Sequence, residues 1–320
     1  MEDSKKIYVI AFYHFTPIEN PDIEVARHKE FLSTRDARAR TYISREGING
    51  QMSASQEAAH EYMHWLREDP RFKEVEFKIH YHFEHVFPRC TIKKREQIVA
   101  LDAKVDLAQT GEHLSPADFR DKLNSRGPNT LLIDVRNDYE WKLGHFEGAE
   151  LPKLEKFREF PKYAEDLAET YDLENTEVLM YCTGGIRCEP YSALLKQKGF
   201  KKVFQLQGGI IKYGLTEGTR GWLGKLFVFD DRLSVAISEE EKAPIIGKCF
   251  HCGQESEVYY NCANMDCNEL FLACPQCAEE WRGCCSKSCQ CTDRLRPFEA
   301  GVHPKPFRRW YSSSEEVSPS

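Results

Sequence analysis

The run Val178-Leu179-Met180-Tyr181-Cys182-Thr183-Gly184-Gly185-Ile186-Arg187-Cys188-Glu189 sets a cysteine between an apolar, strand-like stretch and a segment with helical spacing. A strand–loop–helix turn of this kind gathers backbone N–H groups and the positive end of a helix dipole around one point. Gly184 and Gly185 leave no side chain over that point. A thiol held there has a lowered pKa, so a thiolate or a persulfide on it is stabilised. The run therefore predicts a reactive sulfur at Cys182, in preference to a buried structural cysteine.

The motifs on either side of this loop occur in a definite order. The strand-like run Leu131-Leu132-Ile133-Asp134-Val135-Arg136 is followed by Gly144-His145 and Gly148-Ala149, and Gly208-Gly209 comes after the loop. This order resembles the rhodanese (sulfurtransferase) domain over residues 112–222. The resemblance implies an α/β domain with a parallel sheet and helices on both faces. Ser115, followed by Pro116, marks the start of its first helix.

Residues 1–99 are typical of a smaller α+β domain. Its strands and helices are expected in the order β-α-β-β-α-β, which is that of a ferredoxin-like (acylphosphatase-like) fold. The second helix has Ser55 as its N-cap residue. The expected strands are residues 7–13, 40–43, 50–53 and 74–79, and the expected helices are residues 22–32 and 56–66.

Basic residues gather in this first domain and indicate a contact with RNA. The loop Arg45-Glu46-Gly47-Ile48-Asn49-Gly50 joins the two middle strands, and Lys93-Lys94-Arg95 closes the domain. A solvated helix face is the alternative, because Asp and Glu are interleaved with the cations. The residues expected to contact RNA are Arg45, Asn49, Lys93, Lys94 and Arg95.

Residues 245–296 carry a metal-binding pattern. Ten of the thirteen cysteines fall between Cys249 and Cys291. Each Cys-x-x-Cys turn delivers two thiolates and zinc takes four, so these cysteines are enough for two zinc ions, with His251 in reserve. A redox-active thiol cluster or an iron–sulfur centre is the alternative. One ion is expected on Cys249, Cys252, Cys274 and Cys277, and the other on Cys262, Cys267, Cys289 and one of Cys284 or Cys285, of which we take Cys284.

The overall composition narrows the class of protein. The 320-residue chain has a formal net charge of −7 and is 41% hydrophobic, which suits packed cores in two or three domains. No apolar run approaches the roughly 18 residues of a membrane span and no signal peptide is evident, so we expect a cytoplasmic protein that does not contact membranes. Cysteines grouped for a metal also fit a reducing compartment. Residues 312–320 are polar and expected to be disordered, and the sequence does not indicate an oligomeric state.

Residues 7–289 as a whole resemble the bacterial oxygen-dependent tRNA uridine(34) hydroxylase family. The resemblance rests on Gly47-Ile48-Asn49-Gly50 in the first domain, on the octapeptide that begins at Cys182, and on the cysteine-rich end. It implies hydroxylation of wobble uridine 34 to 5-hydroxyuridine, with the anticodon region of tRNA as partner and molecular oxygen as co-substrate. We find no flavin or nicotinamide motif in the chain.

One set of side chains in the first domain could mimic an iron site. On a strand, His80, His82 and Glu84 would share a face, as two histidines and one carboxylate do around iron. Neighbouring ligands on one strand seldom converge on a single ion. We therefore favour an exposed strand end or an RNA-facing patch at this position.

The residues in and around the loop are expected to have different chemical roles. Cys182 is the nucleophile or persulfide carrier, Arg187 adds positive charge that orients an anionic group, and Cys188 is a candidate resolving thiol or a buried helix residue. Asp134 and Arg136 are expected to pair with each other or to brace the loop. The other loop residues are Thr183, Gly184, Gly185 and Ile186.

Two further functional classes stay open beside the hydroxylase. The loop chemistry alone favours a rhodanese-type sulfurtransferase that carries a cysteine persulfide. The first domain and the cysteine-rich segment would also suit a non-catalytic module that binds RNA or protein.

Overall fold

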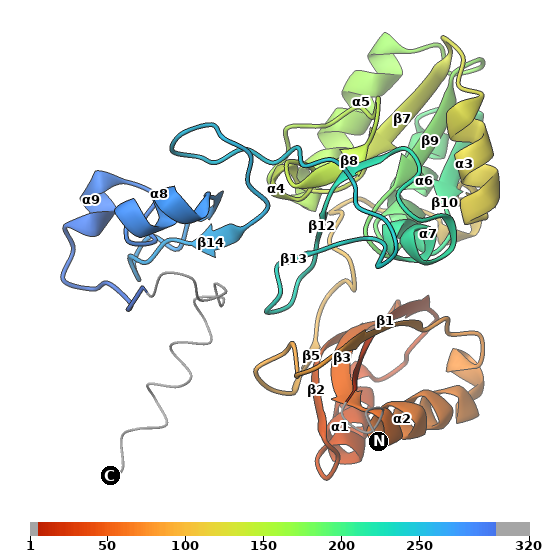
Figure 1. The fold of residues 1–320 in the computed structure, drawn as a ribbon. Coiled ribbons are helices and arrows are strands. Elements are labelled where there is room, and N and C mark those ends of the chain that lie inside the picture. The colour runs from red at the N-terminus through yellow and green to blue at the C-terminus, as the bar shows by residue number, and fades with distance from the viewer. Residues whose placement is uncertain (1–5, 299–320) are drawn as a thin grey trace. The chain divides into compact units, whose positions relative to one another are not determined.

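The computed structural model describes residues 6–298 of the chain. The predicted disorder of residues 312–320 concerns residues outside this range. The chain divides into two compact units, of which the first ends at Asp102 and the second begins at Ala103 (Figure 1).

The first unit combines a five-stranded sheet with two helices. Its elements are β1 Ile7–Phe15, α1 Pro21–Leu32, β2 Ala37–Ser44, β3 Gly47–Ser55, α2 Gln56–Glu68, β4 Lys78–His82 and β5 Thr91–Lys94. The strands lie in the order β4-β1-β3-β2-β5. All neighbours pair antiparallel except β2 and β5, which are parallel. The first four strands with the two helices reproduce the predicted β-α-β-β-α-β order of a ferredoxin-like fold.

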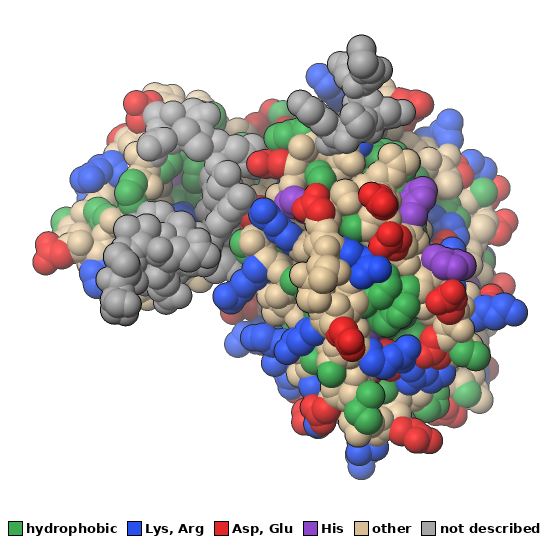
Figure 2. Space-filling model, turned by 90° about the horizontal axis from the view of Figure 1, so that it is seen from below, with side chains coloured by type: hydrophobic (Ala, Val, Ile, Leu, Met, Phe, Trp, Pro, Cys, Tyr) green, Lys and Arg blue, Asp and Glu red, His purple; other side chains and the backbone are tan. Residues whose placement is uncertain are grey.

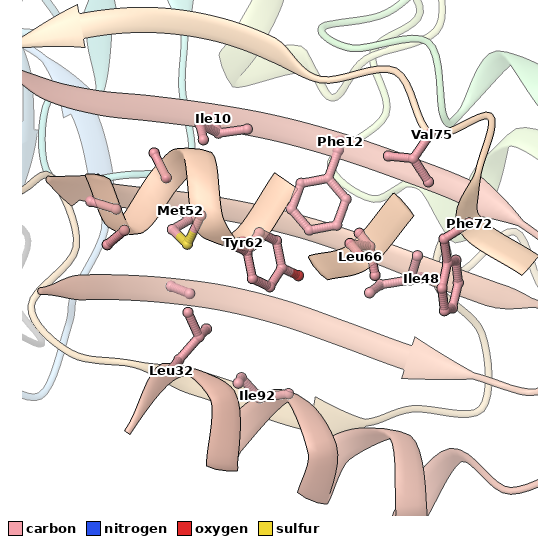
Figure 3. Close-up of a cluster of buried hydrophobic side chains, with 14 of the residues drawn as sticks. Ile10, Phe12, Leu32, Ile48, Met52, Tyr62, Leu66, Phe72, Val75 and Ile92 are labelled. Atoms are coloured by element: carbon pink, nitrogen blue, oxygen red, sulfur yellow. The ribbon is translucent and has the colours of Figure 1, made fainter. Parts of the chain in front are cut away.

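Both helices of this unit cover one face of the sheet. Ile10 and Phe12 of β1 and Met52 of β3 point toward the helices, and Tyr62 and Leu66 of α2 meet them in a buried cluster (Figure 3). Full burial of an apolar side chain of this size contributes roughly 1.5–3 kcal/mol relative to its exposure. This cluster fixes the helix-covered face, so the residues that alternate with it along the strands belong to the other face of the sheet.

Several element boundaries in this unit differ from the sequence prediction, and one strand was missed. The strand β2 ends at Ser44 and β3 begins at Gly47, so the predicted six-residue loop between them is a turn of two residues. The strand expected over residues 74–79 begins only at Lys78. Val75 lies in a turn, where its N–H donates to the Phe72 carbonyl and its side chain is buried in the core. The alternation of buried and exposed residues over this segment therefore reflects core packing and not hydrogen bonding to a neighbouring strand. The strand β5 was not predicted, because Ile92 is its one apolar residue. The cap at Ser55 is confirmed.

The second unit contains a four-stranded parallel sheet in the order β6-β10-β9-β7. Its strands β9 and β7 are buried on both faces, which explains why they read as continuous apolar runs. The elements of this part are β6 Glu112–Leu114, α3 Pro116–Asn124, β7 Thr130–Asp134, α4 Asp138–Trp141, β8 Gly144–Phe146, α5 Phe160–Thr170, β9 Glu177–Tyr181, α6 Cys188–Gln197, β10 Lys202–Leu206 and α7 Gly209–Glu217.

Helices cover both faces of this parallel sheet. The helix α3 packs with α7, and α5 packs with α6 (Figure 1). The predicted helix start is confirmed, because the Ser115 hydroxyl accepts the Asp118 N–H at 3.2 Å. This is the rhodanese architecture that the sequence predicts. Among residues 6–298, every helix falls short of the length and apolar content that a membrane span requires.

The rest of the second unit is made of short elements. They are β11 Trp222–Gly224, β12 Leu226–Phe227, β13 Ser234–Val235, β14 Tyr259–Asn261, β15 Leu270–Leu272, α8 Pro275–Glu280 and α9 Lys287–Gln290. Tyr259 and Leu272 of the β14–β15 hairpin pack against Leu143 and Phe227. The Tyr259 hydroxyl also donates to the carbonyl of Tyr139 at 2.5 Å. These contacts join the cysteine-rich segment to α4 of the rhodanese part.

Candidate functional site

Cys182 lies at the carboxyl end of β9, in the loop that leads into α6. Its side chain is fully buried, and the Gly185 N–H donates to its sulfur at 3.2 Å. Gly185 has a φ of +99°, a conformation that glycine adopts without strain. The loop closes where the Cys188 N–H donates to the Gly185 carbonyl at 3.1 Å and α6 begins. Backbone donors and a helix N-terminus therefore surround the sulfur.

The start of α7 packs directly on this loop. The Ile210 N–H donates to the Cys182 carbonyl at 3.0 Å. Gly209 has a φ of +69°, and a Cβ at this position would lie 2.6 Å from the Cys182 carbonyl oxygen and 2.7 Å from the Gly185 nitrogen. The second glycine of the Gly208-Gly209 motif is therefore needed for the close approach of two backbone segments.

We expect Gly209→Ala to destabilise the second unit by about 2–4 kcal/mol, because it adds a left-handed alanine and a backbone overlap. Gly184→Ala is the matched control, since nothing lies within 4 Å of a Cβ built there. The control should stay within about 0.5 kcal/mol of the wild type. Urea unfolding of both variants measures the difference, and equal losses would contradict the close approach of α7 to the loop.

Arg187 is buried, and its guanidinium is engaged by Glu140. The two ion-pair contacts measure 2.5 Å from Nη1 to Oε2 and 2.8 Å from Nη2 to Oε1. The Thr183 hydroxyl donates to the same carboxylate at 3.1 Å, so Glu140 ties the two ends of the loop together. Glu140 in turn accepts the Asn137 N–H at the start of α4. The Arg187 guanidinium therefore holds the loop in place through Glu140. Its positive charge also acts on the Cys182 sulfur.

Glu140 contacts both ends of the Cys182 loop, and the sequence did not predict this role. The signal was present, because Asn137 with Glu140 three residues later is a helix-start pattern. That pattern predicts a cap. It does not predict that the same carboxylate reaches across to another loop.

Asp134 and Arg136 pair with each other at the end of β7. Both are fully buried, and the guanidinium contacts the carboxylate at 2.8 and 2.6 Å. Arg136 also donates to the Gly144 carbonyl at 2.6 Å, and its guanidinium carbon lies 5.4 Å from the Trp222 ring centroid. The predicted pairing is present, and it braces the segment around Gly144.

Charge and hydrogen bonds keep the Cys182 sulfur ionisable despite its burial. Burial alone would raise the pKa of this thiol. A hydrogen bond from the Cys188 thiol, the charge of Arg187 and the N–H groups of Arg187 and Cys188 outweigh that effect and bring the pKa to about 6. Burial and the neighbouring Cys182 raise the pKa of Cys188 well above its usual range. The lowered pKa of Cys182 favours its thiolate at neutral pH, whereas the raised pKa of Cys188 favours the thiol.

The cysteine-rich segment brings eight thiols together in two groups of four. Within each group all sulfurs lie within 4.8 Å of one another. The groups alternate in pairs along the chain, which is the predicted cross-braced arrangement. The first group is Cys249, Cys252, Cys274 and Cys277, and the second is Cys262, Cys267, Cys285 and Cys289.

The second group differs at one position from the predicted set. Cys285 belongs to it, whereas the Cys284 sulfur faces the Arg282 carbonyl at 3.8 Å. Adjacent residues in a turn point their side chains in different directions, so spacing alone could not separate the two cysteines. His251 stacks on the Trp281 ring with centroids 4.2 Å apart and belongs to neither group.

The spacing of the sulfurs fits a tetrahedral metal ion. Four thiolates at the zinc–sulfur distance of about 2.3 Å lie roughly 3.8 Å apart. Observed separations are 3.8 Å for Cys252 and Cys274, 3.6 Å for Cys267 and Cys285, and 3.9 Å for Cys285 and Cys289. The two groups can therefore each hold one metal ion. In the described residues, His80, His82 and Glu84 form no such group, and β4 ends at His82 before Glu84.

The basic residues of the first unit fall into two sets. On the helix-covered side, Arg27 pairs with Glu24 and Asp69, and Arg35 pairs with Glu61. Figure 2, which views the molecule from below, shows Lys and Arg side chains interspersed with Asp and Glu side chains. The cations of the first set therefore match the alternative of a solvated helix face.

The residues predicted to contact RNA lie mostly on the helix-free face. Tyr42 of β2 is the register partner of both Asn49 and Lys93, and the Arg95 guanidinium lies 5.0 Å from the Tyr42 ring centroid. Asn49 also donates its side-chain N–H to the Ile98 carbonyl at 3.1 Å. Two predicted residues lie elsewhere: Lys94 pairs with Asp22 at 2.7 Å, and Arg45 is exposed in the turn between β2 and β3.

Three protein-family models match successive parts of the chain. The UPF0176 acylphosphatase like domain matches residues 7–98, the Rhodanese-like domain matches residues 115–215, and the Rhodanase C-terminal model matches residues 223–290. A solved rhodanese-like domain from Anabaena sp. aligns with 36% of this chain and 80% of its own, with 19% identity and a TM-score of 0.30.

Curated proteins match the chain over nearly its whole length. The tRNA uridine(34) hydroxylase of Protochlamydia amoebophila is 53% identical over 309 residues, which are 97% of this chain and 96% of the relative. The proteins of the same name from Chlamydia felis and Chlamydia muridarum are 51% and 53% identical and cover 96% and 95% of this chain. The alignments cover 94% and 93% of those two relatives.

Proposed function

This chain belongs to the tRNA uridine(34) hydroxylase family, and we propose that it converts wobble uridine 34 of tRNA to 5-hydroxyuridine with molecular oxygen as co-substrate. The observation that carries the proposal is an identity of 51–53% to relatives of that name across both units. The buried thiolate at Cys182 supplies a chemical reason for the rhodanese loop in such an enzyme.

Cys182 is the proposed nucleophile. Addition of its thiolate to C6 of the uracil ring makes C5 electron-rich, and C5 is the carbon that receives oxygen. The Gly185 N–H and the charge of Arg187 hold the thiolate ready, while Glu140 and Thr183 fix the loop that carries it. In this proposal Cys182 is the residue that reacts, and the buried residues Glu140 and Thr183 fix the position of its loop.

Sulfur transfer is the second candidate function. The same cradle of N–H groups would stabilise a persulfide on Cys182, and a persulfide is what a rhodanese-type enzyme passes to its acceptor. Turnover of thiosulfate that leaves tRNA unchanged would favour this candidate over the hydroxylase.

We place the anticodon region of the tRNA against the helix-free face of the first unit. Lys93 and Arg95 supply positive charge there for phosphates, and the Tyr42 ring offers a surface on which an unstacked base can lie. Asn49 and Arg45 flank this group. All thirteen cysteines are free of disulfides, which supports a reducing compartment, and we place the protein in the cytoplasm.

We assign zinc to both cysteine groups, in a structural role. All four positions of each ion would be filled by thiolates, so neither ion offers an open position for chemistry. The buried cluster around them consists largely of the cysteines themselves, together with Tyr260, Ala263, Phe271, Ala273 and Ala278. Metal binding would therefore supply much of the folding free energy of this segment.

Two zinc ions per chain are expected, and Cys285→Ser should reduce this to one. Cys284→Ser is the matched control at the neighbouring position, and it should retain two. Inductively coupled plasma mass spectrometry of the purified full-length variants measures the ratio. Loss of an ion from the Cys284 variant, with two retained in the Cys285 variant, would reverse the assignment.

The function is tested by nucleoside mass spectrometry of tRNA from cells that lack this protein. We expect 5-hydroxyuridine and its derivatives to fall sharply, and to return when the wild-type gene is restored in air. They should not return under anaerobic growth, because the proposed reaction consumes O₂. Unchanged nucleosides in the deletion strain would overturn the hydroxylase proposal and leave sulfur transfer as the leading account.

A further inference from the structure

The proposed hydroxylation needs a source of two electrons, which uridine and O₂ alone do not supply. When one atom of O₂ is attached to C5 of uridine, the other atom must leave as water, and that step consumes two electrons. Two thiols that join in a disulfide release two electrons and two protons. A dithiol beside the reacting carbon would therefore complete the reaction.

Cys188 is placed to be the second thiol. It is the first residue of α6 and is fully buried, as Cys182 is. The loop between the two cysteines folds back on itself, because the Gly185 N–H donates to the Cys182 sulfur at 3.2 Å and the Cys188 N–H donates to the Gly185 carbonyl at 3.1 Å. The chain between the two cysteines includes Gly184, around whose Cβ position no atom lies within 4 Å, so the connecting loop has room to adjust. Cys182 and Cys188 are the two cysteines that flank this loop, and each shifts the pKa of the other.

The two thiols share one buried environment. Cys182 and Cys188 both have 0% exposure, so a reactant that gains access to one of them is next to the other. The remaining eleven cysteines lie outside this loop: eight form the two metal-binding groups, Cys284 and Cys291 lie in the same cysteine-rich segment, and Cys90 belongs to the first unit.

We propose that Cys188 is a catalytic residue that, together with Cys182, supplies the two electrons for reduction of the second oxygen atom. The proposal rests on the hydroxylase function and adds the electron source to it. Each turnover leaves one Cys182–Cys188 disulfide, which a cellular dithiol must reduce before the next turnover.

The atoms and electrons of this step balance. The C5–H and O–O bonds break, and the C5–O and S–S bonds form. Cys188 takes the second oxygen as a sulfenic acid, and Cys182, after it leaves C6, displaces that oxygen as water. The C5 proton, the Cys188 thiol proton and the proton that Cys182 released on ionisation account for the hydroxyl proton of 5-hydroxyuridine and the two protons of water. Uridine is oxidised by two electrons, the dithiol by two, and O₂ is reduced by four.

The test is a single turnover with the full-length, zinc-loaded protein. The protein is reduced, freed of reductant, and mixed with unmodified tRNA in air. Peptide mapping without reduction then counts Cys182–Cys188 disulfides, and nucleoside mass spectrometry counts 5-hydroxyuridine. We expect one disulfide for each modified uridine, and at least a tenfold slower disulfide formation when tRNA is left out.

Variants separate this proposal from the proposed function. Cys188→Ser should lose at least tenfold in hydroxylation rate and form no disulfide, whereas Cys90→Ser should match the wild type. Formation of 5-hydroxyuridine with both thiols still reduced would overturn the role of Cys188 and leave the hydroxylase intact. Absence of 5-hydroxyuridine even with an added dithiol would overturn the proposed function itself. Because the count of disulfides is made on the wild type, the result does not depend on the folding of a variant.

Discussion

Replacement of Cys182 by serine is expected to lower the rate of 5-hydroxyuridine formation by about 10³-fold or more, because a hydroxyl at this position stays protonated and does not add to C6. Serine preserves the size of the side chain, so the buried loop should keep its fold. The rate is measured with purified protein, unmodified tRNA and nucleoside mass spectrometry. Cys90→Ser is the control for loss of a thiol outside the site and should retain full activity.

The pH dependence of the hydroxylation rate provides a second test of the role of Cys182. The pKa of Cys182 is about 6, below its ordinary value, so the thiolate fraction and kcat/KM should rise through about pH 6 and level off above it. An unperturbed thiol would place the same rise near pH 8.5. The lowered pKa also means that the thiolate adds stability above the unfolded-state pKa, and that this stability is lost as the pH falls toward 6. Activity of Cys182→Ser equal to that of the wild type would remove Cys182 from the chemistry.

Local sequence signals predicted much of the fold, because they act over a few residues. Ser55 and Ser115 begin helices where their hydroxyls can accept a backbone N–H, and that geometry needs only three neighbouring residues. The strand β9 was found because burial on both faces makes it apolar throughout. By contrast, β5 gains its place from parallel pairing with β2, which no local pattern encodes.

The candidate site was predictable to the same extent. Cys182 and its glycines form one short motif and could be read directly. The engagement of Arg187 by Glu140 spans 47 positions of the chain and depends on how α4 packs beside the loop. The choice between Cys284 and Cys285 depends on side-chain direction within a turn. The Arg187–Glu140 contact and the choice of cysteine both depend on tertiary structure. Neither can be predicted from the local pattern of a single sequence.

Replacement of Glu140 by glutamine is expected to cost about 3–5 kcal/mol of unfolding free energy, because it leaves the buried Arg187 guanidinium without its counter-charge. Glutamine keeps the shape of the side chain, so the effect reports charge. Asp138→Asn is the matched control on the same helix, since Asp138 pairs with the half-exposed Lys142 and its loss should cost at most about 1 kcal/mol. Urea unfolding of the second unit in the full-length protein measures both variants.

The pH dependence of stability distinguishes this ion pair from ordinary packing. Burial would raise the pKa of Glu140, but the charge and hydrogen bonds of Arg187 bring it below its ordinary value. The stabilisation is therefore complete above the ordinary carboxyl pKa of about 4.3 and is lost as the pH falls below it. The difference in unfolding free energy between wild type and Glu140→Gln should shrink over that acid range. A difference that stays constant with pH, or a loss no larger than that of Asp138→Asn, would mean that the loop is held by its backbone contacts and not by this pair.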